Sequence, residues 1–191
     1  RNFLRKAVTY NFKAETTLGC LYARAAAAKA AKSDSDVERV RRFIRNKANE
    51  LCEQQKGLNK QLDVVQSLNY PVLVALLDDY FGVPAPVNAQ FNKWQRTMFY
   101  DLFLNLTNNK KKHELAVQSG KERIAWVRKV IVERRAAHLA GQKIGDNILD
   151  RMILLQEKPG YEWVDDDVIR RNIGGLLSGI SEGTNKAVIH V

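Results

Sequence analysis

The last thirty residues of the chain hold the side chains whose types and spacing best suit chemistry. Ser181, Glu182 and Thr184 stand within four positions of one another. A carboxylate and hydroxyl groups can carry a proton to a reacting atom that lies within hydrogen-bond reach. A helix is expected here. Residues four apart lie on one side of a helix, so glycines spaced by four would form a stripe without side chains along it. The stripe consists of Gly175, Gly179 and Gly183.

This glycine stripe needs a physical reason. Each glycine inside a helix destabilises it by roughly 1 kcal/mol relative to alanine. Without a Cβ atom, the stripe allows another body to approach the backbone closely. That body is either a neighbouring helix or a flat ligand with its substrate, and the spacing alone favours a neighbouring helix.

The composition of the 191-residue chain is that of a globular protein, with 45% hydrophobic and 27% charged residues. One domain is therefore expected over residues 1–191. No apolar run is long enough to span a membrane, and the N-terminus lacks the apolar core of a secretory signal. The net charge of +10 favours acidic partners, such as nucleic acid or an anionic membrane surface. A solvated basic surface explains the same charge without any partner.

The cysteines and histidines do not predict a metal site. Cys20 and Cys52 are the two cysteines, and neither belongs to a Cys-x-x-Cys pattern or a Cys/His cluster. Such a low cysteine content fits a reducing compartment, and we expect a cytoplasmic protein. A disulfide between the two stays open. The three histidines are scattered along the chain without metal-ligand spacing.

The hydrophobic periodicity predicts a mainly α fold with about seven helices and one short strand. Residues 1–16 have no clear period and are expected to be irregular. The strand is expected at "LDVV", and the basic run "NNKKKHE" at residues 108–114 is expected to be a loop. Ser35 and Glu38 have the spacing of a capping box. The expected helices cover residues 17–32, 35–54, 70–82, 91–106, 113–139 and 146–157, and the last begins near residue 164.

The order of these segments resembles a known family. The final segment "IRRNIGGLLSGISEGTNKAV" is similar to the long central helix of bacterial-type cytochromes P-450, the heme-thiolate monooxygenases. Upstream, "YPVLVALLDDYFGVP", "FNKWQRTMFYDLFLNL" and "DNILDRMILLQ" follow in the order of the helices that precede that central helix. The resemblance covers about residues 17–191, which correspond to the middle of a family member.

The resemblance implies roles for individual residues. The helix would pass over a heme at Gly179 and Gly183, with Gly175 one turn before them. Glu182, Thr184 and Ser181 would be the candidate proton-carrying groups. On the alanine-rich segment, Arg24 would bind a heme propionate, because a charge-assisted bond to a carboxylate is strong.

The chain also departs from the family pattern. The cysteine loop that supplies the axial heme ligand lies far downstream in the family and is absent here. Ile180 stands where the family usually has glycine, and Gly183 where it usually has the threonine that hydrogen-bonds iron-bound oxygen. Either Thr184 or Ser181 substitutes, or the chemistry uses a preformed peroxide, or monooxygenation has been lost.

The resemblance implies the distal half of a heme-thiolate oxygenase or peroxygenase that acts on a lipophilic small molecule. Its proximal half would lie on a missing segment or a partner chain, and an acidic redox partner would suit the basic surface. Two alternatives stay open. The chain is a non-catalytic remnant of the family, or a basic module whose helix at 113–139 binds an acidic partner or nucleic acid. Acidic residues within that helix weaken the nucleic-acid alternative.

Overall fold

The computed structural model describes residues 33–56, 62–86, 88–143 and 145–189. In these ranges the chain forms six α-helices and two short π-helical segments, so the mainly α prediction is confirmed. The expected helix at 17–32 and the irregular residues 1–16 lie outside the described residues. The elements are α3 (Ser33–Gln55), η1 (Val64–Asn69), α4 (Tyr70–Asp79), α5 (Asn88–Phe99), η2 (Tyr100–Leu104), α6 (Lys110–Leu139), α7 (Ile148–Gln156) and α8 (Asp166–Ile189).

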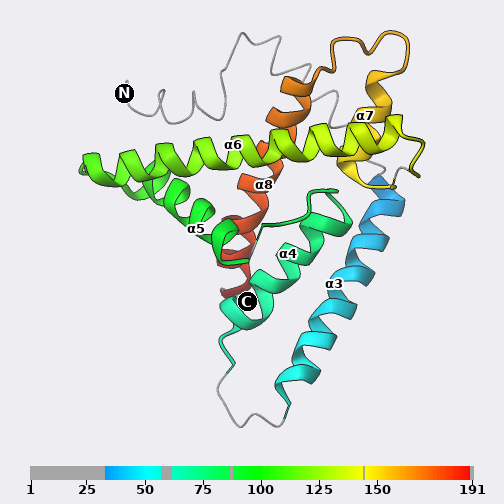
Figure 1. Cartoon of the computed structure of the whole chain (residues 1–191). Helices are drawn as coiled ribbons and strands as arrows, with labels where there is room; N and C mark the ends of the chain where they lie inside the picture. The colour runs from blue at the N-terminus through cyan, green and yellow to red at the C-terminus, as the bar shows by residue number, and fades with distance from the viewer. Residues whose placement is uncertain (1–32, 57–61, 87, 144, 190–191) are drawn as a thin grey trace.

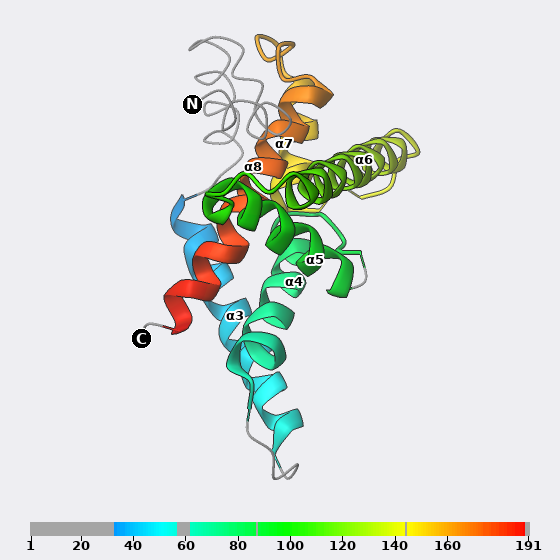
Figure 2. The same cartoon turned by 90° about the vertical axis from the view of Figure 1, so that its left-hand side faces the viewer.

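The helices cross one another rather than forming a parallel bundle. Figure 1 shows the long helix α6 lying across α8, with α4 and α3 below it. Figures 1 and 2 together show that α8 passes from α7 at one end, under α6, to a C-terminal part beside α4 and α5. Helix α5 packs along α6, and α8 contacts α4, α5, α6 and α7. Helix α8 therefore runs through the centre of the described fold.

The core forms around the apolar stripe of α8. Ile169, Ile173 and Leu177 follow at steps of four, and all three are fully buried. They pack in one cluster with side chains of α4, α6 and α7, among them Leu77, Ile131, Leu149 and Met152. The predicted apolar face of the last helix is thus confirmed, and Asp166 and Asp167 occupy its first turn, as its dipole favours.

The short strand predicted at residues 62–65 is wrong. Val64 and Val65 begin the helical segment η1, and the described residues contain no strand. The Asp63 side chain accepts a hydrogen bond of 2.9 Å from the backbone N–H of Gln66 and so caps the first helical turn. A short apolar run fits both a strand and a helix, and here the cap favours the helix.

Two other local predictions also need correction. Helix α3 has already begun at Ser33, so Ser35 lies inside the helix and is not its cap. The run at 108–114 is largely helical, because Asn109 caps α6 through a bond from Lys112 N, and the helix begins at Lys110. Both helices therefore begin a few positions earlier than predicted, and for α6 the cap at Asn109 explains the shift.

The turn that follows α4 packs against the first residues of α7 and hydrogen-bonds with them. Gly82 adopts a φ of +72°, and a Cβ atom there would lie 2.1 Å from Oδ1 of Asn147. Asn147 in turn caps α7 by accepting from the backbone N–H of Asp150 at 2.9 Å. The backbone N–H of Ile148 donates to the carbonyl of Tyr80 at 2.9 Å. Glycine is therefore required at position 82 on both conformational and steric grounds.

Candidate functional site on helix α8

The predicted site residues lie on different sides of the second half of α8. Gly179 and Gly183 are exposed, and a Cβ atom built on either would meet no atom of the described residues within 4 Å. Thr184 is half-buried, whereas Ser181 is only 1% exposed and faces the interior. Glu182 lies in the helix, but its side chain is outside the described part of the structure.

The glycine side of α8 is open in the described structure. The spacing alone favoured a neighbouring helix against the stripe, and the described residues place no atom close to Gly179 or Gly183. Gly175 is half-buried. The neighbouring glycine, Gly174, faces α6 instead, where its added Cβ would lie 3.9 Å from Nη2 of Arg123. The open part of the stripe is thus the stretch that carries Gly179 and Gly183.

The buried side of α8 is attached to α5 by Gln95. This glutamine is 3% exposed, and its Nε2 donates to the carbonyl of Leu177 at 2.5 Å and to Oγ of Ser181 at 2.7 Å. Ser181 Oγ also donates to the same carbonyl at 3.2 Å. In an α-helix that carbonyl accepts from the N–H four residues later, at position 181. Three donors therefore converge on one carbonyl just before the open glycines.

A buried arginine attaches the same part of α8 to α6. Arg123 is 1% exposed, and its Nη1 donates to Oγ of Ser178 at 2.6 Å and to Oε1 of Gln95 at 2.9 Å. Burial, together with the charge of Arg170, lowers the pKa of Arg123 to about 10. Burial disfavours the charged form, so the pKa falls. Arg123, Gln95 and the serines of α8 form one polar network inside an apolar core.

Sequence reasoning missed this network. From the sequence, the basic helix at 113–139 is expected to be a solvated surface or a module that binds an acidic partner or nucleic acid. A signal was present, however, because Gly120, Arg123 and Val127 lie three and four residues apart and share a face of α6. All three are buried. A charged residue in line with small and apolar positions indicates a buried charge.

A second contact joins α5 and α6 nearer to solvent. Nε1 of Trp94 donates to Oε2 of Glu122 at 2.7 Å, and Nε2 of Gln118 donates to Oε1 of the same carboxylate at 2.9 Å. The bond from Gln118, followed by that from Trp94, lowers the pKa of Glu122 below its ordinary value of 4.5. Trp94 itself is buried, so its ring belongs to the core between α5 and α6.

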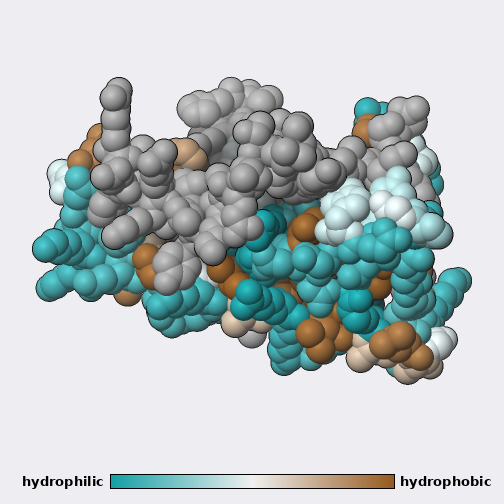
Figure 3. Space-filling view, turned by 90° about the horizontal axis from the view of Figure 1, so that it is seen from above, coloured by the Kyte–Doolittle hydropathy of each residue, from teal (hydrophilic) through white to brown (hydrophobic). Residues whose placement is uncertain are grey.

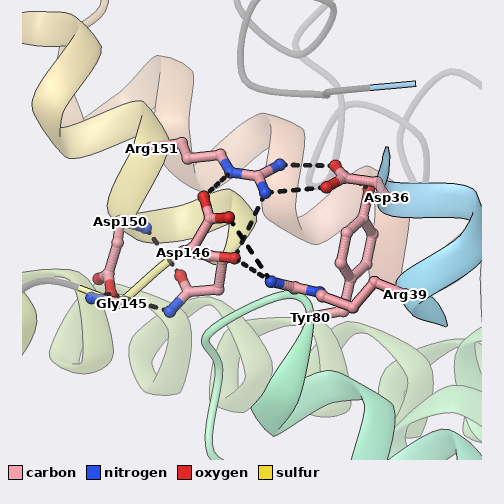
Figure 4. A network of polar contacts seen from close by, with 8 residues as sticks. Asp36, Arg39, Tyr80, Gly145, Asp146, Asp150 and Arg151 are labelled. Atoms are coloured by element: carbon pink, nitrogen blue, oxygen red, sulfur yellow. Dashed lines mark hydrogen bonds and ion pairs between the residues drawn. The ribbon is translucent and has the colours of Figure 1, made fainter. Parts of the chain in front are cut away.

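At the opposite end of the molecule, charged residues attach α3 to α7 (Figure 4). Arg151 forms a bidentate ion pair with Asp36, in which Nη1 donates to Oδ2 at 2.6 Å and Nη2 donates to Oδ1 at 2.9 Å. Tyr80 donates from its hydroxyl to Oδ2 of Asp36 at 3.0 Å, and Arg151 also donates to Oδ1 of Asp146 at 2.7 Å. The bonds to Asp36 raise the pKa of Arg151, and burial followed by the bond to Asp36 raises that of Tyr80.

The described residues meet some of the requirements of a heme site. At Gly179 and Gly183 the helix backbone has no side chain, and no atom of the described residues lies within 4 Å of the Cβ positions. Such a surface fits a flat group lying against α8. The described residues offer no cluster of three or more metal-binding side chains, and the one cysteine among them, Cys52, is exposed on α3. Arg24, the predicted propionate ligand, lies outside the described residues. The described residues therefore include open helix backbone that a flat group could approach, and no buried cysteine.

Comparison with known proteins gives one significant relative. Cytochrome P450(MEG) of Priestia megaterium is 27% identical to this chain over 137 residues, which are 72% of this chain and 31% of that protein. The chain thus spans less than a third of the length of this relative. No protein-family model matches the chain. The similarity supports a relationship to cytochromes P-450, in agreement with the resemblance of its sequence.

Proposed function

We propose that this chain forms the distal wall of a heme-thiolate oxygenase or peroxygenase. The observation that carries the proposal is the open glycine backbone of α8, Gly179 and Gly183, in a chain related at 27% identity to a cytochrome P-450. When bound, a heme would supply the oxygen chemistry, and the protein would supply the pocket, the orientation and the proton traffic. The axial thiolate would come from a proximal half on another segment or chain.

Within this proposal, each residue of α8 has a separate task. Gly179 and Gly183, with Gly175 before them, would let the flat group lie close to the backbone. Thr184 and Glu182 would hold or move a proton beside it, because a hydroxyl and a carboxylate are the helix groups nearest the open stretch. Because Gly183 has no hydroxyl, the proton task falls on its neighbours.

Ser181 has a hydroxyl that bonds with Gln95 and with the Leu177 carbonyl on the buried side. We propose that it fixes the rotation of α8, in addition to its predicted part in proton transfer. The buried network then holds the glycine face outward. A helix that is already held in place binds its ligand more tightly than a flexible segment would, because no binding free energy is spent on ordering the helix.

The predicted substrate and partners depend on the resemblance. Many apolar residues between positions 70 and 106 are explained by packing, because Leu77, Phe91 and Trp94 are buried in the fold. A lipophilic small molecule, an acidic redox partner, the heme-propionate role of Arg24 and a cytoplasmic location remain predictions. None of the helices in the described ranges is both long and apolar enough to cross a membrane.

The test is heme binding by the chain together with its proximal half. The expected result is one bound heme per complex and, after reduction, a carbon monoxide spectrum typical of thiolate ligation. An assembly that contains the proximal half and binds no heme would overturn the proposal and favour the alternative of a non-catalytic remnant. Binding of nucleic acid with steep salt dependence and without heme would favour the basic-module alternative instead.

A further inference from the structure

The three tryptophans of the chain lie in different surroundings. Trp94 of α5 is 6% exposed, and its Nε1 donates to Oε2 of Glu122 on α6 at 2.7 Å. Trp163, in the loop before α8, donates instead to the backbone carbonyl of Gly160 at 3.1 Å. Trp126 of α6 is half-buried. Of the three, Trp94 is the one that is both buried and hydrogen-bonded through its indole N–H to a carboxylate.

The carboxylate of Glu122 is held by neutral groups. Two glutamine side chains donate to it, at 2.9 Å and 3.3 Å. Neutral amides leave the negative charge of a carboxylate in place, whereas a bound guanidinium offsets most of it. Asp36 shows the contrast, because it accepts a bond from the Tyr80 hydroxyl at 3.0 Å but is also paired with Arg151. Of these two carboxylates, Glu122 is therefore better suited to take a proton from its aromatic partner.

A second indole lies against the buried one. The ring centroids of Trp94 and Trp126 are 5.8 Å apart, and Phe91 packs on Trp126 with 6.2 Å between centroids. Aromatic rings at these separations are in contact. Because Trp126 is half-buried, its ring reaches solvent while Trp94 stays inside. The two indoles thus connect the interior of the α5–α6 contact with the surface.

We infer that Trp94 and Glu122 form a redox-active site, in which the indole gives one electron to a one-electron oxidant and the carboxylate takes the indole proton. The negative charge beside the ring stabilises the positive charge that develops as the electron leaves. An oxidised indole is a much stronger acid than the indole itself, so its proton moves along the hydrogen bond that already exists. Trp126 then returns an electron from the surface side.

The step balances within this pair. Trp94 loses one electron, its Nε1–H bond breaks, and an O–H bond forms at Oε2 of Glu122. The products are a neutral indolyl radical, a protonated carboxyl group and the oxidant reduced by one electron. When Trp126 returns the electron, the proton moves back to Nε1. Figure 3 shows that hydrophilic atoms cover most of the described surface seen from above, so a water-soluble oxidant or reductant can approach the protein without a hydrophobic docking site.

The inference does not rest on the proposed heme site. It is tested with the chain alone and with a water-soluble ruthenium polypyridyl complex, which a laser flash converts into a one-electron oxidant. Transient absorption distinguishes the neutral indolyl radical from its protonated form, because the two absorb at different wavelengths. Heme binding by the complete assembly is a separate measurement, so either proposal can fail without the other.

Variants with a single tryptophan locate the reaction. With Trp126→Phe and Trp163→Phe, the remaining indole is Trp94, and the neutral radical should form without a protonated radical before it. With Trp94→Phe and Trp126→Phe, the remaining Trp163 should give the protonated radical first and lose its proton to water later. The same order of species in both variants would overturn the inference, as would a first radical on tyrosine.

Glu122→Gln tests the proton acceptor and keeps the size of the side chain. In the variant that retains only Trp94, this change should slow formation of the neutral radical about 100-fold, the low end of what a positioned base contributes. The control is Glu133→Gln, which removes an exposed carboxylate of the same helix and should leave the rate nearly unchanged. The same loss in both would assign the effect to the general charge of the protein and overturn the role of Glu122.

The part of Trp126 needs its own measurement. With ascorbate in solution, the radical at Trp94 should be reduced faster in Trp163→Phe, which keeps Trp126, than in the variant that also carries Trp126→Phe. Equal rates would remove Trp126 from the path of the electron.

Discussion

Arg123 donates a hydrogen bond to Ser178 across the contact between α6 and α8, with 2.6 Å between Nη1 and Oγ. Both groups lie beneath the open glycine face of α8. Because Arg123 also bonds Gln95 at 2.9 Å, one buried guanidinium joins three helices. The orientation of the candidate site is therefore set by polar contacts on the opposite side of the same helix.

Gln95→Leu should destabilise the fold by about 2 kcal/mol. The change removes the two hydrogen bonds that Nε2 of Gln95 donates to α8, and it leaves buried polar atoms without their partners. We also expect faster amide hydrogen exchange around Ser181, because its helix turn loses an anchor. Urea unfolding and exchange measured by mass spectrometry test both. The control is Gln90→Leu on the same helix, whose bond to Glu122 at 3.3 Å is exposed and whose loss should cost less than about 0.5 kcal/mol. Equal losses in the two variants would contradict the anchoring role.

Asp36→Ala should be among the most damaging changes outside α8. Asp36 is 5% exposed, and its removal leaves the buried Arg151 without its bidentate partner. Breaking a buried ion pair from one side destabilises a protein by about 3–5 kcal/mol, and the remaining bond to Asp146 should keep the loss near the lower value. Glu38→Ala is the control, because its pair with Arg41 is exposed and contributes about 0–1 kcal/mol. Thermal unfolding of both variants is the measurement. A larger loss of stability in Asp36→Ala than in Glu38→Ala would show that Asp36 attaches α3 to the fold.

Gly179→Ala and Gly183→Ala should each stabilise the isolated chain by roughly 0.5–1 kcal/mol. Alanine favours a helix over glycine, and the added methyl group would meet no atom within 4 Å in the part of the chain that the structure describes. A loss of stability would mean that another part of the protein occupies this face. Denaturant unfolding is the measurement.

The same positions separate stability from heme binding. If the proposed function is right, Gly179→Leu should weaken heme binding by the complete assembly at least tenfold while the chain stays folded. Ala136→Leu creates the same side chain at an exposed position of α6, with one carbon atom less added, and should have no effect. Titration with hemin, followed by absorbance, compares the two variants. Unchanged binding by Gly179→Leu would remove the glycine face from the heme site.

Acid should loosen the α5–α6 contact through Glu122. Its pKa is depressed in the folded state, so its contribution is complete above the ordinary value of 4.5 and is lost as the pH falls through the lower folded value. We expect a change of Trp94 fluorescence below pH 4.5, because protonation weakens the bond from its indole N–H. In Glu122→Gln this acid transition should disappear. A transition of the same size in that variant would assign it to another carboxylate.

Much of the helical order could be predicted because periodicity is a local property. Ile169, Ile173 and Leu177 follow the α-helical period, and the structure buries all of them. The strand at 62–65 failed because Val64 and Val65 favour a strand by type, whereas one carboxylate at Asp63 caps a helical turn. Such a capping residue is visible in the sequence, but its preference for a helix start competes with the strand propensity of the valines that follow.

The polar anchors of α8 could not be predicted with the same ease. Gln95 and Ser181 are 86 positions apart, so only the packing of α5 on α8 brings them within 2.7 Å. Arg123 stands in a segment rich in lysine and arginine, where an exposed charge is the ordinary expectation. Its alignment with Gly120 and Val127 was the single local signal. The spacing of the glycines identified the glycine face, and the resemblance to cytochromes P-450 implied a role for it, but neither indicated which residues support it.

Gly82 makes the junction between α4 and α7 intolerant of substitution. Its backbone is left-handed, and Asn147 fills the space where a side chain would begin. Gly141 and Gly160 share the positive φ but have open surroundings. In a saturation library, we expect asparagine to survive at positions 141 and 160 and every replacement to be depleted at 82. Homologues gathered by future sequencing should then keep this glycine even where the residues of α8 diverge and any catalytic task has been lost.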